Sequence, residues 1–367
     1  MVRSREVIVQ PAVSIITPTF NHAEVICECI DSVLAQSRKD WEMIIVDDGS
    51  TDRTSEVVDT YQEPRIRYVR QENIGVGRLK ETYDTALNMA QGRVIGILEG
   101  DDYWPSDKLA VQVPDFDNPD VVLSSGFTQI VRDGKTEGRT PASIPQADAA
   151  VNRPVGRAAL SMMQPDNLTF TFPVSTMIRA STLRKIGGFQ QPPYLPLVDF
   201  PTFLRLSLEG EFRFHDRVLG YWRRHSQSVT QGNLSSILEN AYRYSFEFIR
   251  LYRDRIPATD QELDELENAW DEVAAMRCVL RGRLLSKTDR KEAARAFNEA
   301  LLFRQGSKSA SIVKVAASLS ALGLPVEGIY RVLGRTDLHE AITLSTGDQT
   351  VSVDDMKRDR VVGRWRK

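Results

Sequence analysis

The chain has 367 residues, a length typical of about two domains. Hydrophobic residues make up 41% of it and charged residues 26%, which indicates a globular protein and excludes a disordered or fibrous one. The 47 Lys and Arg residues against 50 Asp and Glu residues give a net charge of −3. This balance lacks the basic field of nucleic-acid-binding proteins, so we expect no nucleic-acid partner.

Apolar runs such as residues 43–46 and 94–98 are far shorter than the roughly 20 residues that span a bilayer. Residues 1–10 lack the apolar stretch of a signal peptide. Of the three cysteines, Cys27 and Cys29 lie two positions apart on a predicted helix, where side chains diverge. We therefore expect a cytoplasmic protein with no transmembrane segment, no disulfide framework and no cysteine-based metal site.

The first 130 residues alternate between short apolar runs typical of buried strands and segments with apolar residues at helical spacing. This pattern predicts strands at 13–17, 43–46, 65–69 and 93–98, and helices at 24–36, 54–61 and 78–90. Such alternation predicts an α/β fold with a mostly parallel, doubly wound sheet. In these folds the ligand crevice lies outside the carboxyl ends of the strands.

Residues 115–170 contain scattered prolines, and we expect one or two strands there, at 121–123 and 127–131. A helix at 201–208 and a strand at 213–215 follow, and residues 235–333 are almost entirely helical in pattern. The expected organisation has three parts, which are a catalytic-type α/β domain at 1–232, an all-α extension at 233–335 and a basic, flexible tail at 336–367.

A polar cluster directly follows each of the four predicted strands. The clusters occupy residues 17–21, 47–52, 72–78 and 99–102. Two acidic clusters at one sheet edge would repel each other unless a cation or a hydrogen-bonding ligand lies between them. Mg²⁺ and Mn²⁺ take carboxylate oxygens and bridge to substrate phosphates, so the pattern indicates a metal–diphosphate site. Taken singly, residues 48–52 also suit an ordinary strand-to-helix turn with a capping Ser50 or Thr51.

The segments VSIITPTFN, IIVDDGSTDRT, ENIGVGR and ILEGDDYWPSDKL occur in this order. Together they resemble the nucleotide-sugar domain of the family 2 glycosyltransferases, which have the Rossmann-like GT-A fold. STMIRASTLRKIGGF, VDFPTFLRL and YWRRHSQSVT resemble the acceptor half of the same domain. The resemblance covers about residues 11–232, and it implies an inverting sugar transfer from a nucleotide donor with the help of Mn²⁺ or Mg²⁺.

The resemblance also implies a role for each polar cluster. The nucleoside pocket would be shaped by Pro18, Thr19 and Asn21, and Asp48 would accept a hydrogen bond from the base. The nucleotide would be contacted by Arg78 and Lys80. Ribose and the divalent ion would be held by Asp101 and Asp102, in an order that the sequence leaves open. Glu99 stands where the family has its first Asp, and the longer side chain alters or removes that contact.

The acceptor half supplies the general base of the expected reaction. An acceptor hydroxyl attacks the anomeric carbon, and a carboxylate within hydrogen-bond reach takes its proton. By position this carboxylate is Asp199, and Pro201 suits the first turn of a helix, whose N-terminus favours an ionised acid. The alternative is a plain helix cap. Val198 replaces the acidic residue that many family members carry here.

Arg223, Arg224 and His225 follow the acceptor half. One hypothesis is that all three residues cover the donor diphosphate and neutralise charge on the leaving group. His225 completes the metal shell in a second reading. A basic surface turn is the alternative to both.

In the helical third, residues 282–297 resemble one tetratricopeptide hairpin, whereas a solenoid needs about three. A helical extension packed on the catalytic domain is therefore preferred, with homodimer formation through it as one use. Residues 356–367 hold six basic residues and one acidic, which suits either contact with anionic lipid on the inner face of the membrane or a solvated tail.

These observations lead to a metal-dependent inverting glycosyltransferase. We expect a UDP-sugar donor, a hydroxyl acceptor on a glycan, glycolipid or protein, and a role in cell-surface polysaccharide biosynthesis. A Rossmann dehydrogenase is disfavoured because no G-x-G-x-x-G follows the first strand. The remaining alternative is a nucleotide-binding adaptor whose helical domain binds a partner and which has little or no transferase activity.

Overall fold

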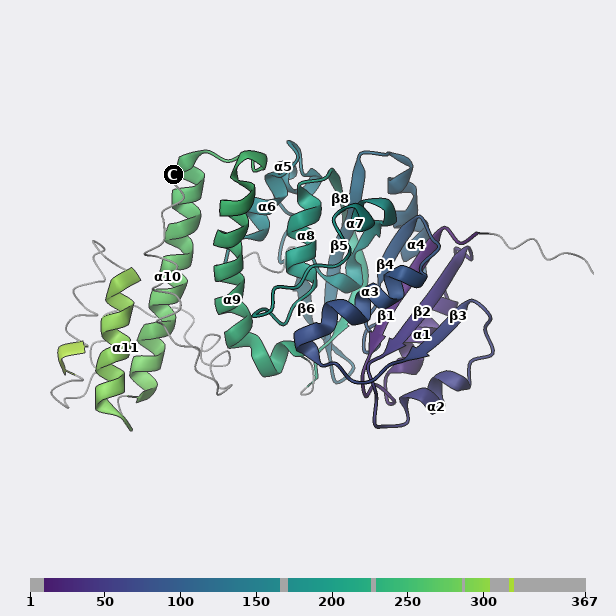
Figure 1. Ribbon diagram of the computed structural model, residues 1–367, viewed down its shortest axis with the longest axis horizontal. Helices are drawn as coiled ribbons and strands as arrows, with labels where there is room; N and C mark the ends of the chain where they lie inside the picture. The colour runs from purple at the N-terminus through teal and green to yellow at the C-terminus, as the bar shows by residue number, and fades with distance from the viewer. Residues whose placement is uncertain (1–9, 166–170, 226–228, 286–287, 304–316, 320–367) are drawn as a thin grey trace, which may run out of the picture. The chain divides into compact units, whose positions relative to one another are not determined.

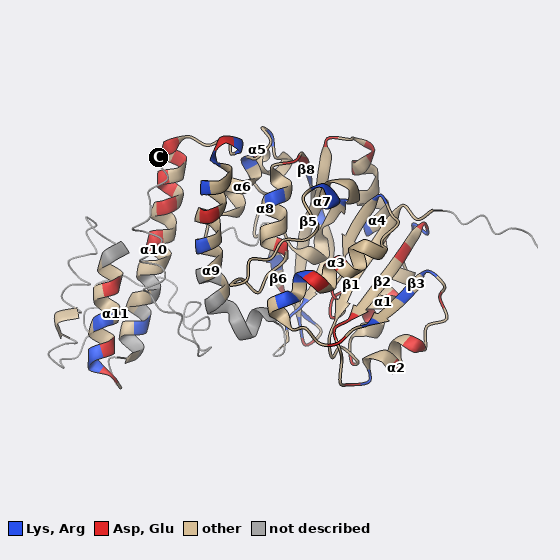
Figure 2. Cartoon of the chain, viewed as in Figure 1, with Lys and Arg blue, Asp and Glu red and all other residues tan. Residues whose placement is uncertain are grey.

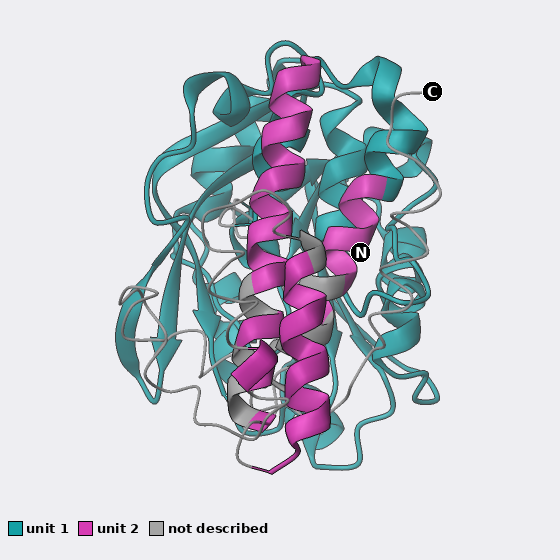
Figure 3. Cartoon of the chain, turned by 90° about the vertical axis from the view of Figure 1, so that its left-hand side faces the viewer, with its two compact units in different colours: residues 1–233, 247–257 teal, residues 234–246, 258–367 magenta. Residues whose placement is uncertain are grey.

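The computed structural model describes residues 10–165, 171–225, 229–285, 288–303 and 317–319 (Figure 1). The chain divides into two compact units (Figure 3). The first unit comprises residues 1–233 and 247–257, and the second comprises residues 234–246 and 258–367. This division places residues 247–257 in the first unit, beyond the boundary at 232 that the sequence suggests.

The first unit is built on an eight-stranded sheet of order β3-β2-β1-β4-β7-β5-β6, with β8 paired to β5. The strands are β1 (Val13–Thr19), β2 (Trp41–Asp47), β3 (Ile66–Arg70), β4 (Val94–Ile97), β5 (Val121–Arg132), β6 (Lys135–Thr140), β7 (Met177–Arg179) and β8 (Glu211–Arg223). The pairs β1–β2, β1–β4, β2–β3 and β5–β8 are parallel, whereas β7 and β6 pair antiparallel to their neighbours. The mostly parallel GT-A-like sheet predicted from the sequence is confirmed.

Short helices connect the strands of the first unit (Figure 1). They are α1 (Ile26–Leu34), α2 (Thr54–Asp59), α3 (Leu79–Met89), α4 (Lys108–Gln112), α5 (Ala147–Val151), α6 (Arg157–Met162), α7 (Ala180–Lys185) and α8 (Asp199–Ser207). Single 3₁₀ turns lie at Val76–Arg78, Val113–Asp117, Pro173–Ser175 and Arg253–Arg255.

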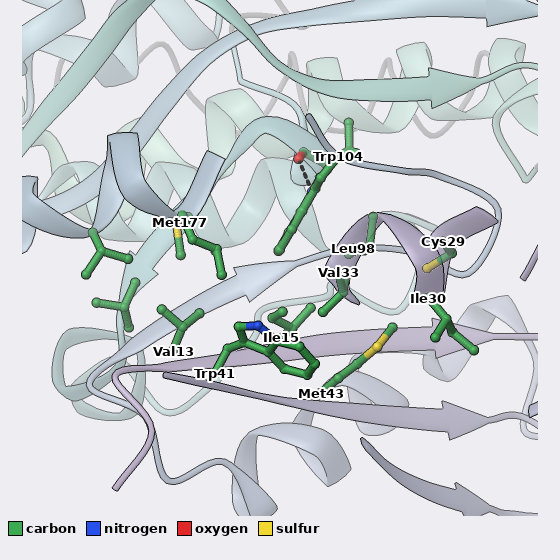
Figure 4. Packing of buried hydrophobic residues seen from close by; sticks show 14 of the residues in the cluster. Val13, Ile15, Cys29, Ile30, Val33, Trp41, Met43, Leu98, Trp104 and Met177 are labelled. Carbon is green, nitrogen blue, oxygen red and sulfur yellow. Dashed lines mark hydrogen bonds between the residues drawn. The ribbon is translucent and has the colours of Figure 1, made fainter. Parts of the chain in front are cut away.

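The core beside β1 and β2 is made of apolar side chains from the strands and from α1 (Figure 4). Ile15, Trp41 and Met43 are at most 1% exposed, because these strands are covered on both faces and their residues are apolar in succession. Trp104 is 3% exposed, and its Nε1 donates to the carbonyl oxygen of Val174 at 2.7 Å. Trp104 is therefore a core residue.

The acceptor half differs from the sequence prediction in β5, β8 and α8, and it also contains β6 and β7, which are not predicted from the sequence. β5 is one strand of 12 residues in place of two short ones, and β8 extends through Arg223 in place of ending at residue 215. The extension is held by pairing with β5 as far as Val131, a long-range contact that periodicity in one segment does not reveal. α8 begins at Asp199, two residues earlier than predicted.

The second unit contains the helices α10 (Asp260–Leu285) and α11 (Arg290–Phe303), and α9 (Val229–Tyr252) contributes to both units. α10 begins with acidic residues (Figure 2), which are favourable at the positive end of a helix. A Cβ at Gly282 would lie 2.7 Å from the ring of Phe297, and Ala293 and Ala296 are fully buried. These small residues let α10 and α11 pack closely.

The structure describes only part of the chain for which the sequence predicts a tail, the lack of a transmembrane segment and the state of the cysteines. The predicted tail at 336–367, and most of residues 304–333 of the predicted helical part, lie outside the described residues. Within the described part of the chain, no helix is both long enough and apolar enough to cross a membrane. Cys27 is exposed, whereas Cys29 and Cys278 are buried.

Candidate active site

Backbone hydrogen bonds join the loops that follow β2 and β4 to the end of β1. The amide of Asp48 donates to the carbonyl oxygen of Thr19 at 2.9 Å, and the amide of Gly100 donates to that of Pro18 at 3.0 Å. Because these strands are parallel, the loops lie at the sheet edge where ligands bind in open α/β folds. The structure therefore brings together the first, second and fourth polar clusters of the sequence.

Asp48 is buried just after β2 and fastens the third cluster to this edge. Its Oδ1 accepts hydrogen bonds from Gln71 Nε2 at 2.8 Å and from the amide of Ile74 at 3.1 Å. Its Oδ2 accepts one from the amide of Gly75 at 3.1 Å. A carboxylate offers about four lone-pair positions, so Asp48 keeps capacity for a nucleobase N–H.

Asn21 joins the loop after β1 to the loop after β2. Its backbone is left-handed, with a φ of 55°, a conformation that Asn tolerates better than most residues. The Oδ1 atom accepts a hydrogen bond from the amide of Thr51, and the amide of Asn21 donates to Ser50 Oγ, both at 2.8 Å. Pro18 and Thr19 are buried at the end of β1. These residues set the shape of the edge at which the nucleoside pocket is expected.

Asp101 and His225 are far apart in the sequence but meet directly in the structure. Nε2 of His225 lies 3.0 Å from Oδ2 of Asp101. Burial alone would raise the pKa of Asp101, but the hydrogen bond from His225 and the charge of His22 outweigh it and hold that pKa below its usual value. The same hydrogen bond raises the pKa of His225. The contact therefore favours an ionised Asp101.

The pKa values of Asp102 and Glu99 are raised, in contrast to that of Asp101. Asp102 is 1% exposed, and its Oδ1 accepts the amide of Arg223 at 2.8 Å. Burial, and then the charges of Asp101 and Glu99, raise the pKa of Asp102. Burial and the charge of Asp101 raise the pKa of Glu99 to about 8, against the effect of a hydrogen bond from Tyr83. Three carboxyl groups this close ionise together only beside a compensating positive charge.

Asp199 is the first residue of α8 and is half-buried. Burial raises its pKa, although the amide of Phe200 and its own amide act in the opposite direction. The charge of Asp199 contributes to the raised pKa of Glu99, so these two carboxyl groups lie within electrostatic reach of each other. The expected general base thus lies near the acidic loop after β4.

The cations predicted to contact the donor are paired with acidic residues. On the first helical turn after β3, Arg78 bonds Glu81 at 2.6 Å and Lys80 bonds Asp84. The side chain of Arg78 is 61% exposed. Contact of Arg78 and Lys80 with a nucleotide therefore remains a proposal.

Arg223 is the last residue of β8 and Arg224 follows it, and the two arginines bind different protein groups. Nε of Arg223 donates to the carbonyl oxygen of Asp101 at 2.8 Å, and its guanidinium also bonds Glu28. The guanidinium of Arg224 lies 3.7 Å from Glu137, on β6. Arg223 thereby fastens the end of β8 to the acidic loop, and a diphosphate contact for either arginine stays a prediction.

Two side chains at this edge, His22 and Tyr83, are not predicted from the sequence. The imidazole of His22 lies against Thr19, and the hydroxyl of Tyr83 donates to Glu99 Oε1 at 2.6 Å. His22 directly follows Asn21 and is one of four histidines, which is a usable signal. Tyr83 lies within α3 and is 3% exposed, so its sequence context resembles that of any core residue.

The predicted metal ligands do not form a complete shell from protein atoms alone. In the described part of the chain, no three His, Cys, Asp or Glu side chains are arranged to hold a metal ion. Asp101 and His225 touch, whereas Asp102 binds the amide of Arg223. Mg²⁺ is often held by one or two carboxylates together with substrate phosphates. The oxygen and nitrogen donors of Asp101 and His225 fit such a shared site.

The fold of the first unit is of the GT-A type. The sequence model of the family described as Glycosyl transferase family 2 matches residues 14–187. Residues 14–187 therefore match the family 2 glycosyltransferases.

Relatives of known sequence support this assignment. The chain is 36% identical over 154 residues to the putative teichuronic acid biosynthesis glycosyltransferase TuaG of Bacillus subtilis (strain 168). This match covers 40% of this chain and 60% of TuaG. It is 27% identical over 267 residues to chondroitin synthase of Pasteurella multocida (strain Pm70), covering 70% of this chain and 25% of that protein. The chain thus spans less than two thirds of the length of these relatives.

Among solved structures, the chain is similar to residues 1–349 of S. aureus TarS in complex with UDP-GlcNAc. The TM-score is 0.53 at 18% sequence identity, and the match covers 89% of this chain and 93% of TarS 1–349. A second TarS structure, in complex with UDP, gives a TM-score of 0.51. This similarity establishes the fold.

Proposed function

We propose that this protein transfers a sugar, with inversion, from a nucleotide donor to the hydroxyl of a glycan, glycolipid or protein. Two observations within a family 2 domain support the proposal. Backbone hydrogen bonds tie the loops that carry Asp48 and Asp101 to the end of β1, and the charge of Asp199 acts on Glu99 in the loop after β4. Asp48 is at the end of β2, Asp101 follows β4, and Asp199 begins α8.

The donor that we propose is a UDP-sugar. Asp48 lies at the loop junction expected to hold the nucleoside, and it has free acceptor capacity for a base N–H. TarS, which shares the fold, was solved with UDP-GlcNAc. Ribose and diphosphate would then extend toward the loop after β4, where Glu99 and Asp101 lie.

In the proposed reaction Asp199 acts as the general base. The acceptor oxygen forms a bond to the anomeric carbon while the bond from that carbon to the diphosphate oxygen breaks, and Asp199 takes the hydroxyl proton. The raised pKa of Asp199 makes its carboxylate a stronger base than an ordinary Asp. Nucleoside diphosphate leaves with the bonding electrons.

A divalent cation, Mn²⁺ or Mg²⁺, is part of the proposal. Asp101 and His225 would hold it, with Asp102 as the further acidic residue of the same loop. When bound, such a cation neutralises negative charge on the diphosphate. It would also relieve the repulsion among the acidic side chains after β4.

Thermal shift and turnover measurements test this proposal together. UDP should raise the melting temperature much more with Mn²⁺ than with EDTA, because acidic side chains and diphosphate repel each other without a cation. A ligand at 100 times its dissociation constant adds about 2.7 kcal/mol to the free energy of unfolding. Asp102→Asn should reduce the shift. An equal UDP shift in EDTA would contradict the metal requirement.

Turnover distinguishes an enzyme from a binding protein. Release of UDP from a panel of UDP-sugars, in Mn²⁺ and with candidate hydroxyl acceptors, is the expected result. UDP binding without any turnover across the panel would favour the nucleotide-binding adaptor.

A further inference from the structure

The backbone of His22 is fixed on both sides. Its amide donates to Thr54 Oγ1 at 2.9 Å. Its carbonyl oxygen accepts the amides of Val25 and Ile26, at 3.0 and 2.9 Å, where the chain enters α1. His22 is half-buried, and these bonds leave its backbone little freedom. The residue is therefore pre-organised, which lowers the ordering cost of any contact that its side chain makes.

The imidazole of His22 is held against the acidic loop. Its Nδ1 lies 2.9 Å from Thr19 Oγ1. A Cβ at Gly100 would lie 2.7 Å from this Nδ1, so the glycine before Asp101 allows the ring and the loop to approach closely. The His22 ring also lies edge-on to the ring of His225, with centroids 6.4 Å apart.

The contact with Thr19 leaves the second ring nitrogen available. When the Thr19 hydroxyl donates to Nδ1, the neutral imidazole carries its proton on Nε2. Among the residues that the structure describes, none forms a hydrogen bond with Nε2 of His22.

We propose that His22 binds the diphosphate of the nucleotide donor through Nε2–H. This inference rests on the proposed function, because only a nucleotide donor brings a diphosphate to the loop after β4. The diphosphate would lie beside Asp101 and Asp102, which repel it, and a fixed N–H donor offsets part of that repulsion. Thr19 is then a positioning residue that selects the tautomer and orientation of the imidazole.

Calorimetric titration of the full chain with UDP and with uridine tests this assignment. His22→Ala should weaken UDP binding by roughly 10-fold or more, the scale of one hydrogen bond to a charged group, and leave uridine binding within about 2-fold. His22→Gln, whose amide nitrogen reaches the place of Nε2, should restore most of the UDP affinity. His22→Asn, which reaches only the place of Nδ1, should not.

Further variants separate contact from support. Thr19→Val should give a smaller UDP-specific loss, because the ring loses its orientation but keeps its N–H. The matched control is His215→Gln, since His215 is a half-buried histidine on β8 that bonds Asp115 at 2.7 Å. This control should bind UDP and uridine as the wild type does. The loss in His22→Ala should also persist in EDTA at higher UDP concentrations.

Three results would overturn the inference. Equal losses of UDP and uridine binding in His22→Ala would make His22 a support of the pocket. An unchanged UDP affinity would remove it from the site, and a loss that disappears in EDTA would assign its effect to the metal. A wild-type chain that does not bind UDP would instead refute the proposed function, and the inference with it.

Discussion

Asp199 combines a position suited to catalysis with an environment that opposes its charge. Asp199→Asn should leave UDP affinity close to wild type while transfer falls by roughly 100-fold or more, as expected for loss of a general base. The check is a comparison of UDP titration with initial transfer rates. Near-normal transfer by this variant would place the base elsewhere.

The raised pKa of Asp199 also gives a pH dependence with a definite sign. The folded state holds the Asp199 proton more tightly than the unfolded state, so this stabilising contribution is present below the unfolded pKa and is lost as pH rises through the folded pKa. The acid limb of the transfer rate should therefore lie above the pKa of an ordinary Asp. Asp199→Asn should raise the melting temperature at pH 7 and not at pH 3, which thermal melts across this range would show.

At single positions, the sequence identifies residues whose place follows from strand order. Asp48 and Asp101 follow apolar strands, and parallel strands bring such residues to one edge. The residues that contact them cannot be predicted in the same way. Contacts such as Arg223 with Glu28, or Tyr83 with Glu99, join segments whose meeting depends on the packing of the whole unit. No local pattern predicts them.

Among the elements, the buried parallel strands are the most predictable, because a strand covered on both faces must be apolar throughout. β1, β2 and β4 appear where the apolar runs indicate them. β6 is the contrary case, since its residues are almost all exposed and its sequence lacks an apolar run. Edge strands and long strands such as β8 depend on their neighbours, which the sequence of one segment does not contain.

The packing of α10 on α11 depends on the absence of a side chain at Gly282. Gly282→Ala would place a methyl group 2.7 Å from the buried ring of Phe297. The expected overpacking cost of about 1–3 kcal/mol exceeds the gain of about 1 kcal/mol in helix propensity. Loss of helical circular dichroism at a lower temperature is the measurement.

A double mutant cycle provides the control for this prediction. In a Phe297→Leu background the same Gly282→Ala change should cost less, because the smaller side chain leaves room for the methyl group. An equal cost in both backgrounds would show that contact with Phe297 is not the cause.

For the whole molecule, the first unit needs residues 247–257. The carboxylate of Glu247 accepts a hydrogen bond from Tyr194, and Arg255 bonds the carbonyl oxygen of Leu208 and the side chain of Glu209. A chain ending at residue 257 should therefore melt at a higher temperature than one ending at residue 234 and should retain UDP binding.

This comparison requires size exclusion chromatography first, because either truncation can expose apolar surface and aggregate. Equal melting temperatures of two monodisperse truncations would mean that residues 247–257 add no stability to the first unit. The loop that carries Tyr194 leads into α8, so loss of this segment should also disturb the placement of Asp199.

Residues 247–257 also have a consequence for the order of events during synthesis. A nascent chain released as far as residue 246 has every strand of the sheet, but it lacks Glu247 and Arg255. The ribosome must therefore make residues 234–246, which belong to the second unit, before the first unit is complete. Newly made protein should acquire its full resistance to protease only after part of the helical unit has been translated.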